Sequence, residues 1–185
     1  MRLLLLAAPG GGKGTQGERL AALYGVQHIS SGDVLRAEVA AGTPVGRKVA
    51  GYQQRGDLVP DEMVFEVLIP VVAAAAAAGG YILDGFPRTV PQARQAADVA
   101  RQLDFTLNAA IHLQVPEEVL VQRLLSRSRA DDTAELIRHR LEVFTEMTRP
   151  LIAYYQSRDI LIEIDGDRDP DVVTAAIMGL DLSGR

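Results

Sequence analysis

The chain has 185 residues with a net charge of −5, and 48% of its residues are hydrophobic. This length and apolar content suit one α/β domain with its own core. The acidic balance argues against a general nucleic-acid binder, which is more often basic. The sequence contains no cysteine, which excludes disulfides and thiolate chemistry and favours a cytoplasmic protein.

The first predicted element is a buried strand over the apolar run Leu3–Leu6. With its extension to Ala8 this run is too short to cross a membrane, so no membrane association is expected. A helix is predicted from Lys13 to about Tyr24. Strands alternating with helical segments predict a parallel sheet. The further predicted strands are Val26–Ile29, Tyr81–Leu83, Ala109–Val115 and Ile160–Ile164.

The segment between the second and third predicted strands is longer than one crossover connection needs. It holds a helical stretch over Ser31–Ala41, a helix start at Thr43-Pro44 and a turn-rich stretch over Gly56–Pro60. These features predict a small inserted unit. Pro70 is predicted to kink or divide the helix that follows the insert.

A glycine-rich segment, Ala7–Gln16, lies between the first predicted strand and the first predicted helix. Glycines let backbone N–H groups point at phosphate oxygens, and the start of the helix adds its positive dipole end. Lys13 supplies a cation for the β- and γ-phosphates, and Thr15 adds a hydroxyl. Two departures from the general phosphate-loop pattern are Ala7 in place of the first glycine and Gly14 before Thr15. We expect Ala7 to be near-extended and to tolerate its methyl group.

The flanking strand and helix disfavour the alternative interpretation of this segment, which is a glycine-rich turn with an incidental lysine.

A second polar segment, Asp84–Gln92, directly follows the third predicted strand. Asp84 lies at the carboxyl end of that strand, where ligands of open α/β sheets bind, and it can hold the water shell of Mg²⁺. Arg88 can bind a phosphate, and Gln92 can read a base edge. Taken alone, this segment also fits an Asp-Gly turn followed by a helix cap.

Several arginines follow the fourth predicted strand. Arg123 and Arg127 are four residues apart on a predicted helix and share one face, and Arg129 and Arg140 lie on the next elements. Positioned cations of this kind stabilise a phosphoryl group during transfer. The alternative is a solvated basic face balanced by nearby acids. These acids are Glu117, Glu118, Asp131 and Asp132.

Taken in their order along nearly the whole chain, these motifs resemble those of the adenylate kinase family. The segments that carry the resemblance are Gly10–Gln16, Ile29–Arg36, Gly56–Pro60, Asp84–Arg88, Val115–Glu118, Arg129–Asp132, Arg138–Arg140 and Asp165-Gly166. The resemblance implies an α/β P-loop NTPase fold with three layers and a five-stranded parallel sheet of order 2-3-1-4-5. It also implies a monomer that reversibly transfers the terminal phosphoryl group of Mg-ATP to AMP, giving two ADP and maintaining adenine nucleotides.

The resemblance also implies a role for each matching residue. The residues implied in ATP binding are Gly10, Gly11, Gly12, Lys13, Gly14, Thr15, Arg123, Arg127 and Gly166. The residues implied in AMP binding are Ser31, Arg36, Asp57, Leu58, Val59, Gly85, Phe86, Pro87, Arg88, Gln92, Arg129 and Arg140. The residues implied in catalysis are Lys13, Arg88, Arg123, Arg127, Arg129 and Arg140. Asp84 would hold Mg²⁺ through water.

The resemblance divides the single domain, 1–185, into a core, an AMP-binding insert at 30–59 and a short lid at 126–132. The core segments are 1–29, 60–125 and 133–185. Only Ser128 separates Arg127 from Arg129, and the lid has no cysteine, so no zinc site is expected. We expect closure to depend on arginines folding inward more than on a broad cover.

Two other functions remain alternatives. A UMP or CMP kinase on the same fold is disfavoured by Gln92, because pyrimidine-specific relatives tend to carry Asn in this region. A nucleotide-binding regulatory protein with little turnover is supported only by Ala7 and the short lid. The histidines are scattered in the sequence, and His28 and His112 are expected to be core or edge residues without a catalytic role.

Overall fold

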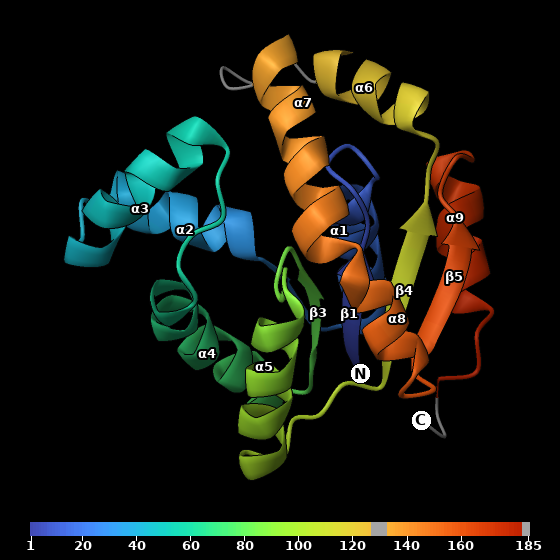
Figure 1. Cartoon of the computed structure of the whole chain (residues 1–185). Coiled ribbons are helices and arrows are strands. Elements are labelled where there is room, and N and C mark those ends of the chain that lie inside the picture. Colours follow the sequence, from blue (N-terminus) through green and yellow to red (C-terminus); the bar gives the residue numbers. More distant parts are fainter. Residues whose placement is uncertain (127–132, 183–185) are drawn as a thin grey trace.

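The computed structural model describes residues 1–126 and 133–182, and its strands form one parallel sheet of order β2-β3-β1-β4-β5 (Figure 1). The strands are β1 (Arg2–Leu6), β2 (Gln27–Ser30), β3 (Tyr81–Asp84), β4 (Ala109–Gln114) and β5 (Leu161–Asp165). The predicted fold class and strand order are confirmed, and no predicted strand end moves by more than one residue.

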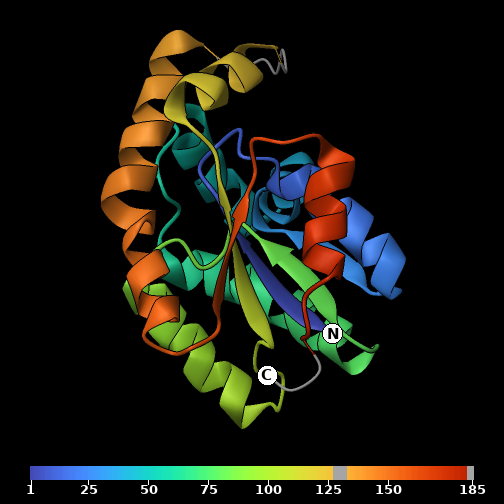
Figure 2. The ribbon, with the colours of Figure 1, turned by 90° about the vertical axis from the view of Figure 1, so that its right-hand side faces the viewer.

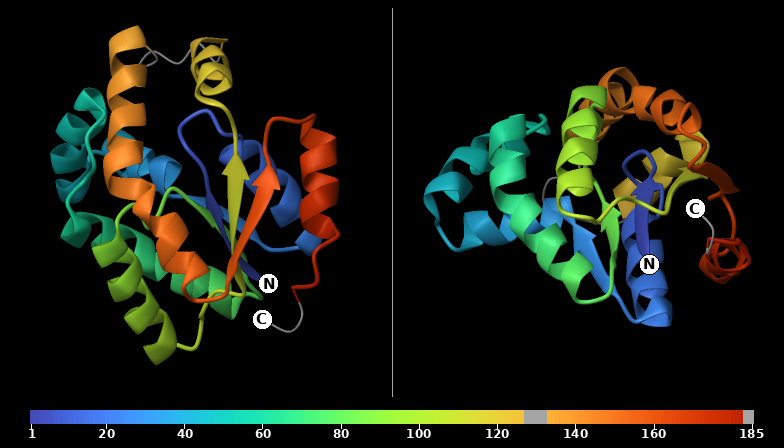
Figure 3. Two further views of the ribbon diagram at one scale, coloured as in Figure 1. Left: turned by 45° about the vertical axis from the view of Figure 1, so that its right-hand side comes forward. Right: turned by 90° about the horizontal axis from the view of Figure 1, so that it is seen from below.

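Helices cover both faces of the sheet, which explains why the central strand is apolar along its whole length. On one face, Leu4 and Leu6 of β1 pack against α4 (Asp61–Ala77), α5 (Val90–Gln102) and α8 (Pro150–Gln156). On the other face, Leu3 and Leu5 pack against α1 (Lys13–Tyr24) and α9 (Pro170–Met178). Figures 2 and 3 show the sheet between these two helical layers, as the three-layer prediction requires.

The segment between β2 and α4 forms two helices, α2 (Ser31–Ala40) and α3 (Pro44–Arg55), beyond the β2–β3 side of the sheet (Figure 1). The predicted helix start is confirmed, because the Thr43 hydroxyl accepts a hydrogen bond from the backbone N–H of Gly46 at 3.0 Å. The two helices approach closely at Gly46, where a side chain would overlap the carbonyl group of Glu38.

Of the two predicted effects of Pro70, a kink or a division, the division is wrong, because α4 is continuous from Asp61 to Ala77. Pro70 and Glu66, whose carbonyl group would have bonded to an N–H at position 70, are both exposed. Water can therefore satisfy the freed carbonyl group. Leu68 and Val72, on either side of Pro70, are buried in the core and hold the helix against the sheet.

Two helices, α6 (Glu117–Ser126) and α7 (Ala134–Val143), stand beyond the carboxyl ends of the central strands (Figure 3). Their contact is a small apolar cluster of Leu120, Leu124, Ile137 and Leu141. A π-helical turn, η1 (Phe144–Thr148), joins α7 to α8. Across residues 1–126 and 133–182, no helix combines the length and the apolar character that crossing a membrane requires.

Candidate active site

A cavity of about 860 Å³ opens at the carboxyl ends of the strands. Its walls come from the glycine-rich loop after β1, from α2, from the loop that follows α3, from the loop after β3, and from α6 and α7. Every predicted site residue that the structure describes lines this one cavity. These residues are Gly10, Gly11, Gly12, Lys13, Gly14, Thr15, Ser31, Arg36, Asp57, Leu58, Val59, Asp84, Gly85, Phe86, Pro87, Arg88, Gln92, Arg123, Arg140 and Gly166. Arg127 and Arg129 lie outside the described residues.

The loop after β1 depends on glycine at Gly10 and Gly12, which have φ values of 82° and 87°. Residues other than glycine rarely adopt this left-handed backbone conformation. Ala7 does not have a positive φ, and its methyl group occupies the space that a side chain on Gly11 would need. The alanine therefore causes no backbone strain at this position, as predicted.

Lys13 begins α1 and lies over the same loop. Its Nζ donates hydrogen bonds to the carbonyl oxygens of Ala7 at 2.7 Å and Ala8 at 3.0 Å. The ammonium group is thereby held at the mouth of the glycine loop, where backbone N–H groups and the helix start favour an anion. A phosphate oxygen could replace either carbonyl as its partner.

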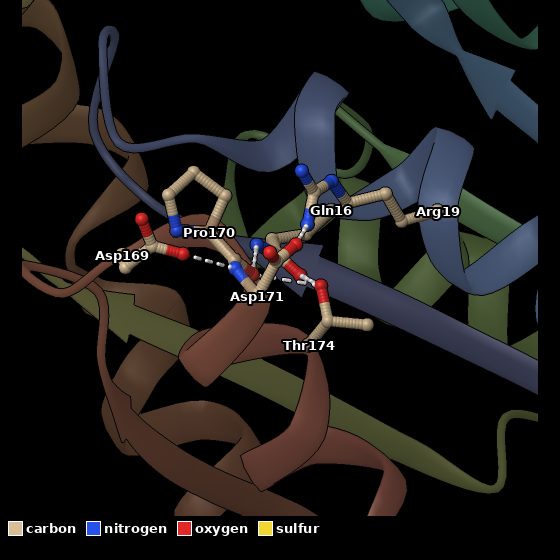
Figure 4. A network of polar contacts seen from close by, with 6 residues as sticks. All are labelled: Gln16, Arg19, Asp169, Pro170, Asp171 and Thr174. Carbon is tan, nitrogen blue, oxygen red and sulfur yellow. Dashed lines mark hydrogen bonds and ion pairs between the residues drawn. The ribbon is translucent and has the colours of Figure 1, made fainter.

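The helix that carries the loop is braced against α9 by a network of polar side chains (Figure 4). Gln16 Nε2 donates to the carbonyl oxygen of Pro170 at 2.9 Å, and Gln16 Oε1 accepts from the Thr174 hydroxyl at 2.8 Å. Arg19 forms an ion pair with Asp171 at the start of α9. Because Gln16 is buried and both ends of its amide are used, its role is to fix α1 beneath the phosphate loop.

Asp84 ends β3 with a carboxylate that is nearly buried and still lines the cavity. His28 Nε2 lies 2.7 Å from Asp84 Oδ2 and donates its proton to it, and this hydrogen bond raises the pKa of the imidazole. On α1, a side chain at Gly17 would overlap the His28 ring, so the ring fits only against glycine.

Sequence reasoning did not assign His28 to the site. The pairing of β2 with β3 in parallel register is the relationship from which its position could have been predicted. Ser30 of β2 lies opposite Asp84, and His28 lies opposite Ile82. Since side chains alternate along a strand, His28 and Asp84 project from the same face of the sheet. Strand order together with this register places an imidazole beside the carboxylate.

The guanidinium groups of Arg36, Arg88 and Arg140 line the cavity, and those of Arg36 and Arg140 are close enough to repel that of Arg88. Arg88 Nε donates to the carbonyl oxygen of Gly85 at 2.7 Å. Desolvation lowers the pKa of the Arg88 guanidinium, the attraction of Asp84 opposes this, and repulsion from Arg140 and Arg36 lowers the pKa further. Like charges held together in a poorly solvated place favour the binding of an anion between them.

The residues that line the cavity include one with an unsatisfied polar atom. Ser31 is 2% exposed, and its Oγ has no hydrogen-bond partner within the part of the chain that the structure describes. A buried hydroxyl without a partner costs about 1–3 kcal/mol, which a ligand atom could recover. The Oγ lies in the space that a side chain on Gly85 would fill, so glycine is needed there as well.

Arg123 of α6 also lines the cavity, and two contacts hold its guanidinium group. Its Nη1 donates to the carbonyl oxygen of Gly166 at 3.2 Å, and its Nη2 contacts Asp167 Oδ1 at 3.1 Å. Arg123 and Gly166, both of which the resemblance implied in ATP binding, are therefore brought together, although 43 residues separate them in the sequence.

Comparison with known sequences identifies the family. The sequence model of the family described as Adenylate kinase matches residues 5–160. The chain belongs to the adenylate kinase family. The strand order is the one that the resemblance to adenylate kinases implied, and the described residues that it implied in nucleotide binding line one cavity. Both observations are consistent with this assignment.

Curated adenylate kinases resemble this chain over almost its whole length. The adenylate kinase of Trichodesmium erythraeum is 45% identical over 182 residues, which cover 96% of this chain and 95% of the relative. That of Corynebacterium urealyticum is 43% identical over 181 residues, covering 98% and 99%. That of Agrobacterium fabrum is 43% identical over 187 residues, covering 96% and 95%.

Proposed function

We propose that this member of the adenylate kinase family reversibly transfers the terminal phosphoryl group of ATP to AMP, giving two ADP. The observation that carries the proposal is that one cavity joins a glycine cradle with Lys13 to a buried polar pocket with Ser31 and Gln92. Arg88 and Arg140 line the same cavity, and Arg140 is close enough to lower the pKa of the Arg88 guanidinium by repulsion. At about 860 Å³ the cavity is at the upper end of the range for small-molecule sites, as two nucleotides require.

On the donor side, the backbone of the glycine loop would bind the ATP phosphates, and Lys13 would exchange its loop carbonyl partners for phosphate oxygens. Thr15 would add its hydroxyl. Arg123 and the backbone at Gly166 would border the ATP adenine. Arg127, for which only the sequence argues, would contact a phosphate.

On the acceptor side, Arg36 and Arg88 would bind the AMP phosphate. Ser31 and Gln92 would contact the adenine, with the unpartnered Ser31 hydroxyl as the strongest support. The remaining AMP-binding residues proposed from the family resemblance are Asp57, Leu58, Val59, Gly85, Phe86 and Pro87.

The chemistry needs little more than positioning and charge neutralisation. AMP presents an anionic nucleophile, so in-line attack on the γ-phosphoryl group needs no strong general base. Arg88, Arg123 and Arg140 would stabilise the charge on the transferring oxygens, joined by Arg127 and Arg129 from the proposed lid. Assembling these arginines only when both nucleotides are bound would limit the loss of phosphate to water.

Asp84 fits a role in holding Mg²⁺ through water. Carboxylate and water oxygens are the ligands that this ion prefers, and Mg²⁺ usually keeps several waters and binds one or two carboxylates with substrate phosphates. Asp84 offers one such carboxylate at the cavity wall, oriented by His28. When bound with ATP, Mg²⁺ neutralises the charge that develops on the phosphate oxygens.

The proposal extends to the organisation of the chain. Residues 30–59 would move as an AMP-binding insert and residues 126–132 as a short lid, on a core made of 1–29, 60–125 and 133–185. We further propose a cytoplasmic monomer that acts on ATP, AMP and ADP without nucleic-acid, membrane or zinc requirements.

The decisive experiment measures ADP formation from Mg-ATP with AMP, CMP, UMP or GMP as acceptor. We expect rapid turnover with AMP and much slower turnover with the others. Faster turnover with CMP or UMP than with AMP would instead assign the chain to pyrimidine nucleotides. Nucleotide binding without ADP formation from any acceptor would favour a regulatory protein.

A further inference from the structure

The side-chain amide of Gln92 has two partners of fixed hydrogen-bonding character. Its Oε1 accepts from the backbone N–H of Arg88 at 2.7 Å, and its Nε2 donates to Asp61 Oδ1 at 2.6 Å. The residue itself is held by its own N–H, which donates to the Thr89 hydroxyl at 3.2 Å. Gln92 is 2% exposed, so water cannot readily substitute for either partner.

These partners permit only one of the two orientations of the amide. A backbone N–H can only donate, and a carboxylate can only accept. Turning the amide over would place its NH₂ group against the Arg88 N–H and its oxygen against the Asp61 carboxylate. Both hydrogen bonds would be lost, and two repulsive contacts would replace them. The chemistry of the two partners therefore assigns the orientation.

The amide keeps one acceptor and one donor for a ligand in the cavity that Gln92 lines. A primary amide has two lone pairs and two hydrogens, and Arg88 and Asp61 use one of each. With the orientation fixed, the oxygen and the nitrogen cannot exchange places. A base edge with an amino group beside an unprotonated ring nitrogen matches this arrangement. A base edge with a carbonyl group beside a ring N–H presents the opposite order.

Ser31 cannot make this distinction, because its hydroxyl rotates and can donate or accept as required. The selection thus depends on the two partners that prevent Gln92 from turning over, of which Asp61 is the one that acts through its side chain. Asp61 is the first residue of α4, at a helix start that favours a negative charge. It lies 31 residues from Gln92 in the sequence and does not itself line the cavity.

We propose that Asp61 is a positioning residue that fixes the Gln92 amide and makes the acceptor site select a 6-aminopurine monophosphate over its 6-oxopurine counterpart. The inference rests on the proposed function, since it takes the Gln92 side of the cavity as the acceptor site. It adds a specificity-determining residue that acts only through Gln92.

The test compares AMP with inosine monophosphate, which replaces the amino group by oxygen and protonates the adjacent ring nitrogen. The informative variant is Asp61→Asn, because an amide of the same size can donate or accept and so pairs with the nearer end of the Gln92 amide in either orientation, which leaves only the Arg88 N–H to fix it. The ratio of kcat/KM for AMP to that for inosine monophosphate should fall roughly tenfold, the effect of removing one of two opposing contacts. The kcat with AMP and the KM for ATP should stay within about threefold of the parent.

Glu62→Gln is the matched control, since it removes the neighbouring carboxylate from the same first turn of α4 on an exposed side chain. It should leave the acceptor ratio unchanged. If Asp61→Asn does not fold, Asp61→Ser repeats the test, because its hydroxyl can also donate or accept.

An unchanged ratio of kcat/KM for AMP to that for inosine monophosphate in the folded Asp61 variant would overturn the inference. An equal fall of kcat/KM with both acceptors, together with a raised KM for ATP, would also overturn it. A parent protein that forms no ADP would instead contradict the proposed function. In that case, calorimetry would measure the affinities of the parent and of Asp61→Asn for the two monophosphates. A roughly tenfold fall in the preference for AMP over inosine monophosphate would support the positioning role, and an unchanged preference would contradict it.

Discussion

The imidazole of His139 in α7 donates a hydrogen bond from Nε2 to the carboxylate of Asp57 at 2.9 Å, although 82 residues separate them. Asp57 follows α3, and Arg55 Nε donates to its other oxygen at 2.8 Å. Hydrogen bonds from His139 and Arg55 lower the pKa of the Asp57 carboxyl group. The loop after α3 is thus linked to α7 by a pair that sequence reasoning missed.

This pair should make stability depend on pH in an acidic range. A carboxyl group whose pKa is lowered on folding stabilises the protein above its unfolded pKa, here 3.8, and loses this effect as pH falls through the folded pKa. The free energy of unfolding of the parent should therefore exceed that of Asp57→Asn at pH 7, with the difference disappearing well below pH 3.8. Urea unfolding across this range measures it.

His139→Ala supplies the control for the Asp57 measurement. Because both changes break the same contact, the double variant should lose less stability at pH 7 than the sum of the two single losses. Strict additivity would show that the two side chains do not interact in solution.

Replacing His28 by Ala should slow catalysis through Asp84. Loss of the hydrogen bond at 2.7 Å would leave the carboxylate free to rotate. Removing a residue that orients a metal ligand in this way typically lowers metal affinity or activity by ~10–100-fold. We expect a lower kcat and a higher Mg²⁺ concentration for half-maximal rate. His112→Ala is the matched control, since His112 contacts Glu163 outside the nucleotide cavity. Equal effects of the two variants would argue against the role of His28.

Lys13→Met should remove most of the activity and leave the fold intact. In the folded protein this change removes two hydrogen bonds to loop carbonyls, whereas the proposed transition state would lose a cation beside the transferring group. We expect kcat to fall by ~10²–10³-fold, with an unchanged circular dichroism spectrum. A parent as inactive as the variant would favour a regulatory nucleotide-binding protein.

Gly46→Ala tests whether α2 and α3 act as an acceptor-binding insert. Because the added methyl group would overlap the Glu38 carbonyl, the two helices must separate. We expect a higher KM for AMP with an unchanged KM for ATP. Gly51→Ala makes the same change in α3, where among the described residues outside the helix backbone only the Arg55 side chain lies near, so it should be neutral or stabilising by about 1 kcal/mol. A raised KM for ATP in Gly46→Ala would contradict an independent insert.

Much of the fold and the site could be predicted because the signals are local. The short apolar run at Leu3–Leu6, ended by glycines, favours a strand buried on both faces, and a glycine-rich stretch between such a strand and a helix favours anion binding. The motif order led to the strand order and to the described site residues, all of which line one cavity.

Pro70 shows why a local rule can fail. Proline weakens a helix by removing one hydrogen bond, but burial of Leu68 and Val72 stabilises α4 by more than this loss when the freed carbonyl group faces water. The outcome depends on which face of the helix is buried, and that follows only from packing.

The sequence by itself determined the strand and helix pattern and the glycine cradle, because each depends on residues close together in the chain. It also determined the family, because each motif is local and their order is read directly from the sequence. Only the tertiary structure decided that His28 orients Asp84, that His139 binds Asp57 and that Asp61 fixes Gln92. These contacts join residues 56, 82 and 31 positions apart. Their distances and directions depend on how strands register and helices pack, which no single segment encodes.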